Sequence, residues 1–181
     1  MLTPAIPQPP AQFAVMDEPL TAGELWARHD DLEVGAATAL GRLLMAFARL
    51  DMSLGLCLVW IDGGAQLATL TPKVEQMTFN NRLDMLASVV VEKFVAGTRK
   101  RSGYELWIAQ THAIRMLRNE LAHGRWGVDP RTNEAVNIIG LPTSPDQREV
   151  RHSIEALNNA VAEIQRLTSR LSQLREQWPL D

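Results

Sequence analysis

Apolar residues recur at spacings of three and four along much of this chain, which is the pattern of amphipathic helices. The longest such stretch covers residues 32–61 and predicts one long helix, whose core face is formed by Leu40, Leu43, Leu44, Phe47, Leu50, Leu54 and Leu58. Two further stretches predict a helix over about 78–96 and another that ends at Ala122 or His123. A last stretch, 153–177, has a narrow apolar seam like that of a coiled coil.

Capping residues and helix breakers set the predicted ends of these helices. The segments Thr21–Glu24 and Ser102–Glu105 both fit the capping box, in which a hydroxyl residue is followed three positions later by glutamate. The first predicts a short helix to about Arg28, with a break or bend at 29–31. The second begins the fourth helix, and residues 65–73 are expected to form a connector closed by a proline.

Beyond the fourth helix the pattern changes. Gly124 is expected to end that helix as a left-handed C-cap, and residues 125–139 predict a short β-hairpin around a turn, followed by a connector over 140–152. Five prolines within residues 1–20 predict a flexible arm. The expected fold class is therefore all-α: one domain over 21–181, an antiparallel up-and-down bundle of four to five helices with a short β-hairpin after the fourth.

Composition narrows the class of protein. The 181 residues carry a net charge of −3, so a general nucleic-acid coat is not expected and any RNA contact has to be local. The single cysteine, Cys57, lies in an apolar run, where a small buried hydrophobe is favoured over a nucleophile. No apolar run reaches a membrane span of about 18 residues, and the N-terminus lacks the pattern of a secretory signal. We expect a cytoplasmic protein with no membrane partner.

The segment with the densest candidate chemistry is Arg118–Gly124, which holds an arginine, an amide (Asn119) and a histidine (His123) at a helix end. Cleavage of RNA through its own 2′-hydroxyl needs proton transfer near neutral pH, which suits histidine, and cationic donors at the phosphate, which suit arginine. Arg118 and His123 are about 140° apart around a helix axis, so they meet only if Arg118 curls, if the helix unwinds at Gly124, or across a two-fold with a second copy. The plain alternative is an arginine, amide and histidine that cap carbonyls and pair with a neighbour.

Other residues are weaker candidates. Asp51, which lies among apolar residues of the long helix, is a possible partner for an arginine of this segment. Trp126 and Tyr104 either stack on bases or pack in the core. The four histidines lack metal-ligand spacing, and phosphate-binding loops are absent, so neither a metal nor a cofactor is expected. The candidate RNA-binding residues, for which a solvated surface is the alternative, are Arg115, His112, Arg99, Lys100 and Arg101.

The segment 118–124 resembles the signature of the HEPN superfamily, in which an arginine, a polar residue and three further positions precede a histidine. Asparagine as the polar residue and the final Ala-His-Gly fit it, and the layout of about 30–175 is similar to the family's helical bundle. The resemblance implies a metal-independent endoribonuclease that needs no cofactor and is often a homodimer, with arginine and histidine of both protomers lining one cleft. It implies catalytic roles for Arg118 and His123 and a supporting role for Asn119.

The resemblance also implies a biological setting. Many members are toxins or defence components, sometimes beside an antitoxin or nucleotidyltransferase partner that silences them. Two alternatives stay open: a non-catalytic HEPN-like binding module that engages a protein or nucleotide partner through the same groove, and a helical scaffold without a small-ligand site.

Overall fold

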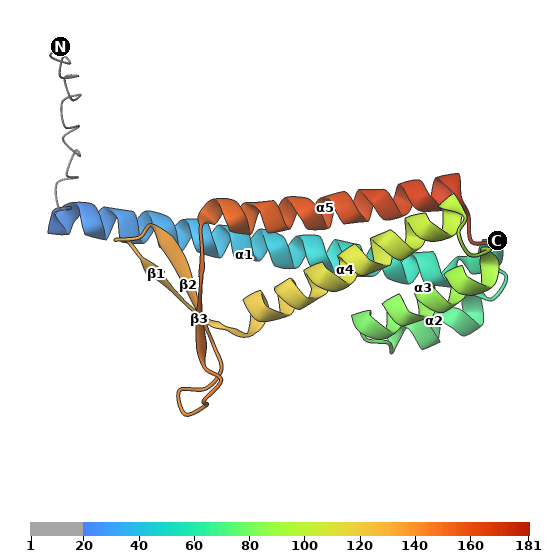
Figure 1. Cartoon of the computed structure of the whole chain (residues 1–181), viewed down its shortest axis with the longest axis horizontal. Coiled ribbons are helices and arrows are strands. Elements are labelled where there is room, and N and C mark those ends of the chain that lie inside the picture. Colours follow the sequence, from blue (N-terminus) through green and yellow to red (C-terminus); the bar gives the residue numbers. More distant parts are fainter. Residues whose placement is uncertain (1–19) are drawn as a thin grey trace, which may run out of the picture.

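A computed structural model describes residues 20–181, which are mostly helical with one small antiparallel sheet (Figure 1). The predicted arm lies outside the described residues except for Leu20. The helices are α1 (Ala22–Val59), α2 (Leu67–Glu75), α3 (Phe79–Lys93), α4 (Arg99–His123) and α5 (Ile154–Gln177), with a short 3₁₀ helix, η1 (Ile61–Gly64), after α1. Between α4 and α5 lie β1 (Arg125–Asp129), β2 (Glu134–Ile139) and β3 (Arg148–His152).

Helix α1 is the central element, and α5 runs beside it in the same direction (Figure 1). Gly35, in the first half of α1, lies against Ile154 at the start of α5. At the other end, the Asp62 N–H donates to the Leu180 carbonyl over 3.3 Å. These contacts hold α5 parallel to α1 from Gly35 to the end of α1.

Helix α4 runs antiparallel to α5. Its Trp107 indole donates to the Leu167 carbonyl over 2.8 Å, and its Tyr104 hydroxyl donates to the Trp178 carbonyl over 2.9 Å. Both rings are almost fully buried and fill the space between the two helices. The expected antiparallel order thus describes α4 with α5, but it does not describe α1 with α5.

The predicted core face of α1 is largely confirmed. The buried part consists of Leu43, Phe47, Leu50, Leu54 and Leu58, which pack against α3, α4 and α5. Leu44, predicted to face inward, is 45% exposed. Within residues 20–181, no helix is both long and apolar enough to cross a membrane.

Two predicted boundaries in the first half of the chain are wrong. The break at 29–31 does not occur, because Leu32 and Ala36 continue the buried face of α1 and the two aspartates of the triplet point to solvent. The connector over 65–73 is largely helix α2, which is held because Val74 is buried against the core.

Two more differences lie around the predicted hairpin. Helix α4 begins at Arg99, capped by the Thr98 hydroxyl, so the predicted start at Ser102 lies one turn inside it. The hairpin is present as β1 and β2, but the predicted connector over 140–152 supplies a third strand, in the order β1-β2-β3.

Candidate functional site

The last turns of α4 carry the predicted catalytic residues and lie where the helix meets the sheet (Figure 1). Ile114 and Leu121 are buried and anchor this part of α4 on the core, with Leu117 partly buried beside them. The polar residues of segment 118–124 therefore sit on a helix end whose apolar side is fixed.

Arg118 is half-buried over the side of α1. Its guanidinium carbon lies 5.1 Å from the centroid of the Phe47 ring, a cation–π arrangement. Its Nη1 donates to the Asn119 side-chain oxygen over 3.2 Å, and its Nε is buried with no hydrogen-bond partner in the described chain. Among residues 20–181 it forms no ion pair with a carboxylate. The guanidinium is thus held in place with its charge uncompensated.

His123 is the last residue of α4, and its side chain is exposed. The carbonyls of this last turn would lack donors if the sheet did not supply them. The Asn137 amide of β2 donates to the Glu120 carbonyl over 3.0 Å, and the Trp126 indole of β1 donates to the Leu121 carbonyl over 2.9 Å. Two side chains of the sheet thus fix the turn that presents His123.

Gly124 was expected as a left-handed C-cap, and that prediction is wrong. Its φ of −83° and ψ of 166° are open to any residue. Glycine is needed here for space, because a Cβ atom would lie 1.4 Å from the side-chain oxygen of Asn137. Asn137 itself is fully buried, and the sequence reasoning did not identify it. The sequence signal was a polar residue, Asn137, within the apolar strand that also contains Ala135 and Ile139.

Arg118 and His123 are not joined by a hydrogen bond within residues 20–181. The helix stays regular through His123, so unwinding at Gly124 does not bring the two together. Five helical residues place them about 140° apart around the axis. The two remaining routes are a curled Arg118 side chain and a second copy of the chain.

The surroundings of the last turn are electrostatically mixed. The Glu120 carboxylate forms an ion pair with Arg148 of β3. Burial lowers the pKa of His152 from its ordinary value, and the Glu120 carboxylate partly offsets this. The His152 ring lies 5.7 Å from the Trp126 ring, centroid to centroid. Neutral His152 therefore forms part of the support for Trp126.

Asp51 does not pair with the motif, which corrects the prediction. Its carboxylate accepts a hydrogen bond of 2.7 Å from Arg82 of α3, whose Nε also donates to the Val74 carbonyl over 3.1 Å. The predicted partner of Arg118 is thus used to attach α3 to α1 and to the end of α2.

Of the predicted RNA-binding residues, two lie near the motif. His112 and Arg115 are half-buried on the same half of α4, and the Arg115 Nε has no hydrogen-bond partner in the described chain. The basic run 99–101 forms the first turn of α4, about 27 Å from Arg118 along the helix. The structure therefore does not bring this run into the same site.

Side chains of the basic run have local partners. Arg101 forms an ion pair of 2.7 Å with Glu105, and the Lys100 ammonium lies 6.0 Å from the Phe94 ring, while Arg99 is exposed. The alternative of base stacking by Tyr104 is excluded in this fold by its complete burial.

Comparison with protein-family models, with curated proteins and with solved structures found no match to this chain.

Proposed function

We propose that this chain is a metal-independent endoribonuclease of the HEPN type, in which Arg118 and His123 act on RNA and Asn119 supports Arg118. The observation that carries the proposal is the uncompensated guanidinium of Arg118, held by Phe47 and Asn119 on the helix end that also exposes His123. A carboxylate partner would neutralise that charge, whereas an uncompensated guanidinium is available to the non-bridging oxygens of a phosphate.

The roles follow from the chemistry of each side chain. The 2′-hydroxyl of the substrate loses its proton as it attacks phosphorus, and the leaving 5′-oxygen gains one. His123 transfers these protons, because imidazole titrates near neutral pH. Arg118 stabilises the charge that develops on the phosphate, and Asn119 orients Arg118 through its side-chain oxygen.

The active form in this proposal is a homodimer with a composite cleft. A single copy leaves Arg118 and His123 on different sides of α4, and a two-fold across this face supplies each from a different protomer. The same proposal assigns to this chain the helical bundle of the HEPN superfamily, which is all-α in its main part.

The test is cleavage of single-stranded RNA by the purified chain in EDTA, with products analysed for 2′,3′-cyclic phosphate ends. His123→Ala and Arg118→Ala are each expected to abolish cleavage. Arg170→Ala, which removes an arginine of α5 far from the motif, is the charge-matched control and should leave it unchanged. RNA binding without cleavage in the wild-type chain would favour the binding-module alternative instead.

A mixing experiment tests the composite cleft. Neither Arg118→Ala nor His123→Ala homodimers have a complete site, but a mixed dimer joins the intact arginine of one protomer to the intact histidine of the other. Mixing is therefore expected to restore part of the activity. Failure to restore it, with both variants folded and dimeric, would place both residues of a site in one protomer.

The proposed biological role is that of a toxin or defence component. Expression should arrest growth, and His123→Ala should relieve the arrest. Relief by co-expression of a neighbouring antitoxin or nucleotidyltransferase would identify the partner that the resemblance implies.

A further inference from the structure

A groove runs along the junction of α1 and β1. Two adjoining cavities, of about 420 and 210 Å³, share His29 as a lining residue. The first begins at Ala22, the first residue of α1, and includes Trp26 and the turn after β1. The second continues to Leu40 and Trp126. Together they form a groove of about 27 Å along α1.

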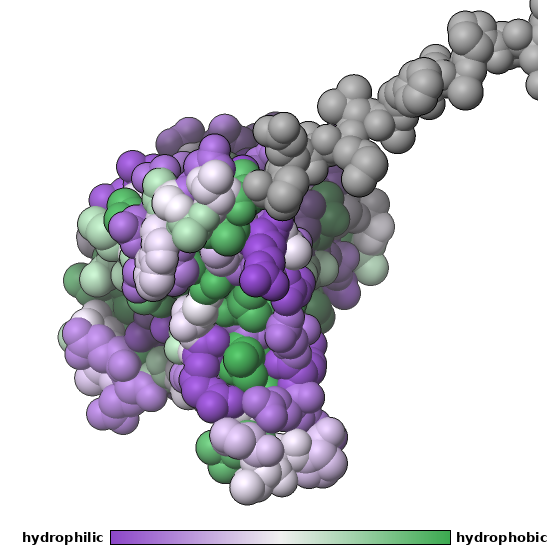
Figure 2. Space-filling model, turned by 90° about the vertical axis from the view of Figure 1, so that its left-hand side faces the viewer, coloured by the Kyte–Doolittle hydropathy of each residue, from purple (hydrophilic) through white to green (hydrophobic). Residues whose placement is uncertain are grey.

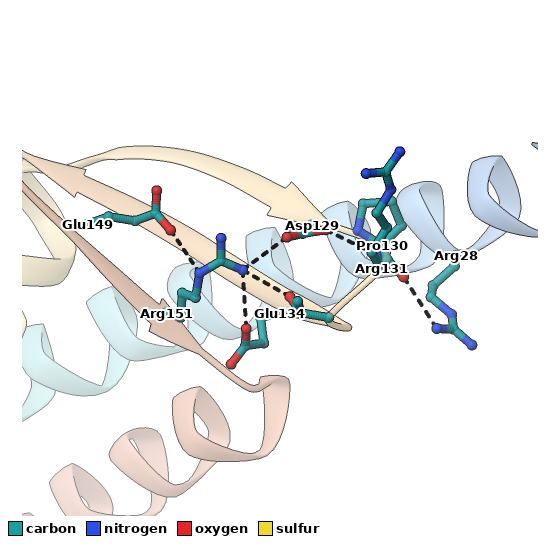
Figure 3. Close-up of polar contacts among 8 residues, drawn as sticks. Arg28, Asp129, Pro130, Arg131, Glu134, Glu149 and Arg151 are labelled. Atoms are coloured by element: carbon teal, nitrogen blue, oxygen red, sulfur yellow. Dashed lines mark hydrogen bonds and ion pairs between the residues drawn. The ribbon is translucent and has the colours of Figure 1, made fainter. Parts of the chain in front are cut away.

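Both walls of the groove are fixed. Arg28 of α1 donates to the Pro130 carbonyl over 3.3 Å and holds the β1–β2 turn against the helix (Figure 3). Arg151 of β3 joins the three strands through carboxylates of Asp129 at 3.0 Å, Glu134 at 3.3 Å and Glu149 at 2.8 Å. An occupant therefore meets a groove that already exists.

The groove has unsatisfied binding capacity. Strand β1 is an edge strand, and within residues 20–181 no strand pairs with its outer side. Trp26 is 69% exposed. Figure 2 looks at this end of the molecule and shows hydrophobic side chains gathered between hydrophilic ones.

The chain itself contains a segment suited to such a groove. Pro4, Pro7 and Pro10 are spaced by three residues. A polyproline II helix has three residues per turn, so in that conformation the three prolines share one face and every backbone carbonyl is free to accept a hydrogen bond. Grooves lined by aromatic side chains are the usual binding sites for segments of this kind.

The geometry of the connection also fits. The described chain begins at Leu20, two residues before the groove opens at Ala22. Residues 11–20 span at most about 35 Å, which is enough to reverse direction and enter the groove. The seven residues 4–10 extend about 22 Å as polyproline II, within the length of the groove. Residues 1–19 contain Asp17 and Glu18 but no lysine or arginine, and Arg131 lines the entrance.

We propose that residues 4–10 of the chain dock in the α1–β1 groove of the same molecule, antiparallel to α1. The three prolines lie against the Trp26 side of the groove. The far end of the groove is Trp126, whose indole caps the last turn of α4. The docked segment thus approaches the candidate site, although the proposal does not depend on ribonuclease activity.

The test is disulfide cross-linking in the full chain. With Pro10 level with Trp26, Ala5 lies about 16 Å further along the segment and Ala37 lies about 16 Å further along α1. Ala37 lines the groove, whereas its neighbour Thr38 is also exposed but points about 100° away. Cys57 does not compete, because burial raises the pKa of its thiol to about 11.

Under oxidised glutathione, the pair Ala5→Cys/Ala37→Cys is expected to form an intramolecular disulfide roughly tenfold faster than the pair Ala5→Cys/Thr38→Cys. Adding Pro7→Ala should slow the reaction, whereas adding Pro9→Ala, which lies off the proline face, should not. Equal rates for the two cysteine pairs would overturn the proposal. So would cross-links that form only between molecules, at a rate rising with protein concentration.

Discussion

The substitution Gly124→Ala tests how the sheet holds the end of α4. Alanine at this φ and ψ is unstrained, and at such positions replacing glycine usually stabilises a protein by about 0.4–1 kcal/mol. Here the new Cβ would lie 1.4 Å from the Asn137 side-chain oxygen and 2.5 Å from its amide nitrogen. The amide must therefore leave its place, and the Glu120 carbonyl loses its donor.

The expected magnitude comes from that lost contact. An intramolecular hydrogen bond contributes about 1 kcal/mol, and leaving a buried polar group without a partner costs about 1–3 kcal/mol more. We therefore expect Gly124→Ala to lower the free energy of unfolding by roughly 2–4 kcal/mol, opposite in sign to the usual effect. Gly127→Ala in β1 is the matched control, since a Cβ at this position meets no atom within 4 Å. The stability of this variant should therefore not fall.

The assay is urea denaturation followed by far-ultraviolet circular dichroism, on the wild type, both glycine variants, Asn137→Ala and the double variant. Removing the Asn137 amide makes room for the methyl group introduced at position 124, so the double variant should be less destabilised than the sum of the two single changes. Additive effects, or a Gly124→Ala variant as stable as Gly127→Ala, would refute the reasoning.

Three further predictions concern the supports of the site and the attachment of α3 to α1. Burial lowers the pKa of His152 in the folded chain below its value in the unfolded chain. The unfolded chain therefore binds the proton first on acidification, and the stability present above about pH 6.5 is lost as the pH falls. The melting temperature of His152→Gln should thus fall less than that of the wild type between about pH 7.5 and pH 5. Arg82→Met leaves Asp51 without its cation and should reduce the free energy of unfolding by about 2 kcal/mol, measured by urea denaturation, whereas an unchanged value would mean that the ion pair is screened. Trp126→Phe keeps the ring but removes the donor to the Leu121 carbonyl, so hydrogen exchange in the last turn of α4 should accelerate while the core stays protected.

The sequence was most informative where structure depends on periodic burial. The apolar spacing along α1 and α5 predicts both helices, because one face of each must lie against the core. It was least informative at boundaries. The charged triplet at 29–31 suggested a break, but a helix tolerates charges wherever their side faces solvent. Strand β3 was missed because it has only five residues, and Val150 is the one apolar residue among them.

The residues of the candidate motif could be named from the sequence, but Asn137, which helps to fix the end of α4, could not. Asn137 is 17 positions from Glu120 and reaches it only because β2 folds back beneath the end of α4. No local spacing rule links the two. The same applies to Asp51 and Arg82, which lie 31 positions apart and meet because α3 runs beside α1.

Trp126 belongs both to the α1–β1 groove and to the candidate site at the end of α4. Its ring lines the far end of the α1–β1 groove, and its N–H donates to a carbonyl one turn before Gly124. A segment that enters the groove and moves this ring would strain or break a single hydrogen bond before it reached the turn that presents His123. Because a helix end with an unsatisfied carbonyl frays readily, loss of this hydrogen bond would loosen the turn that presents His123. Trp126 is therefore the side chain through which occupation of the groove would affect the motif.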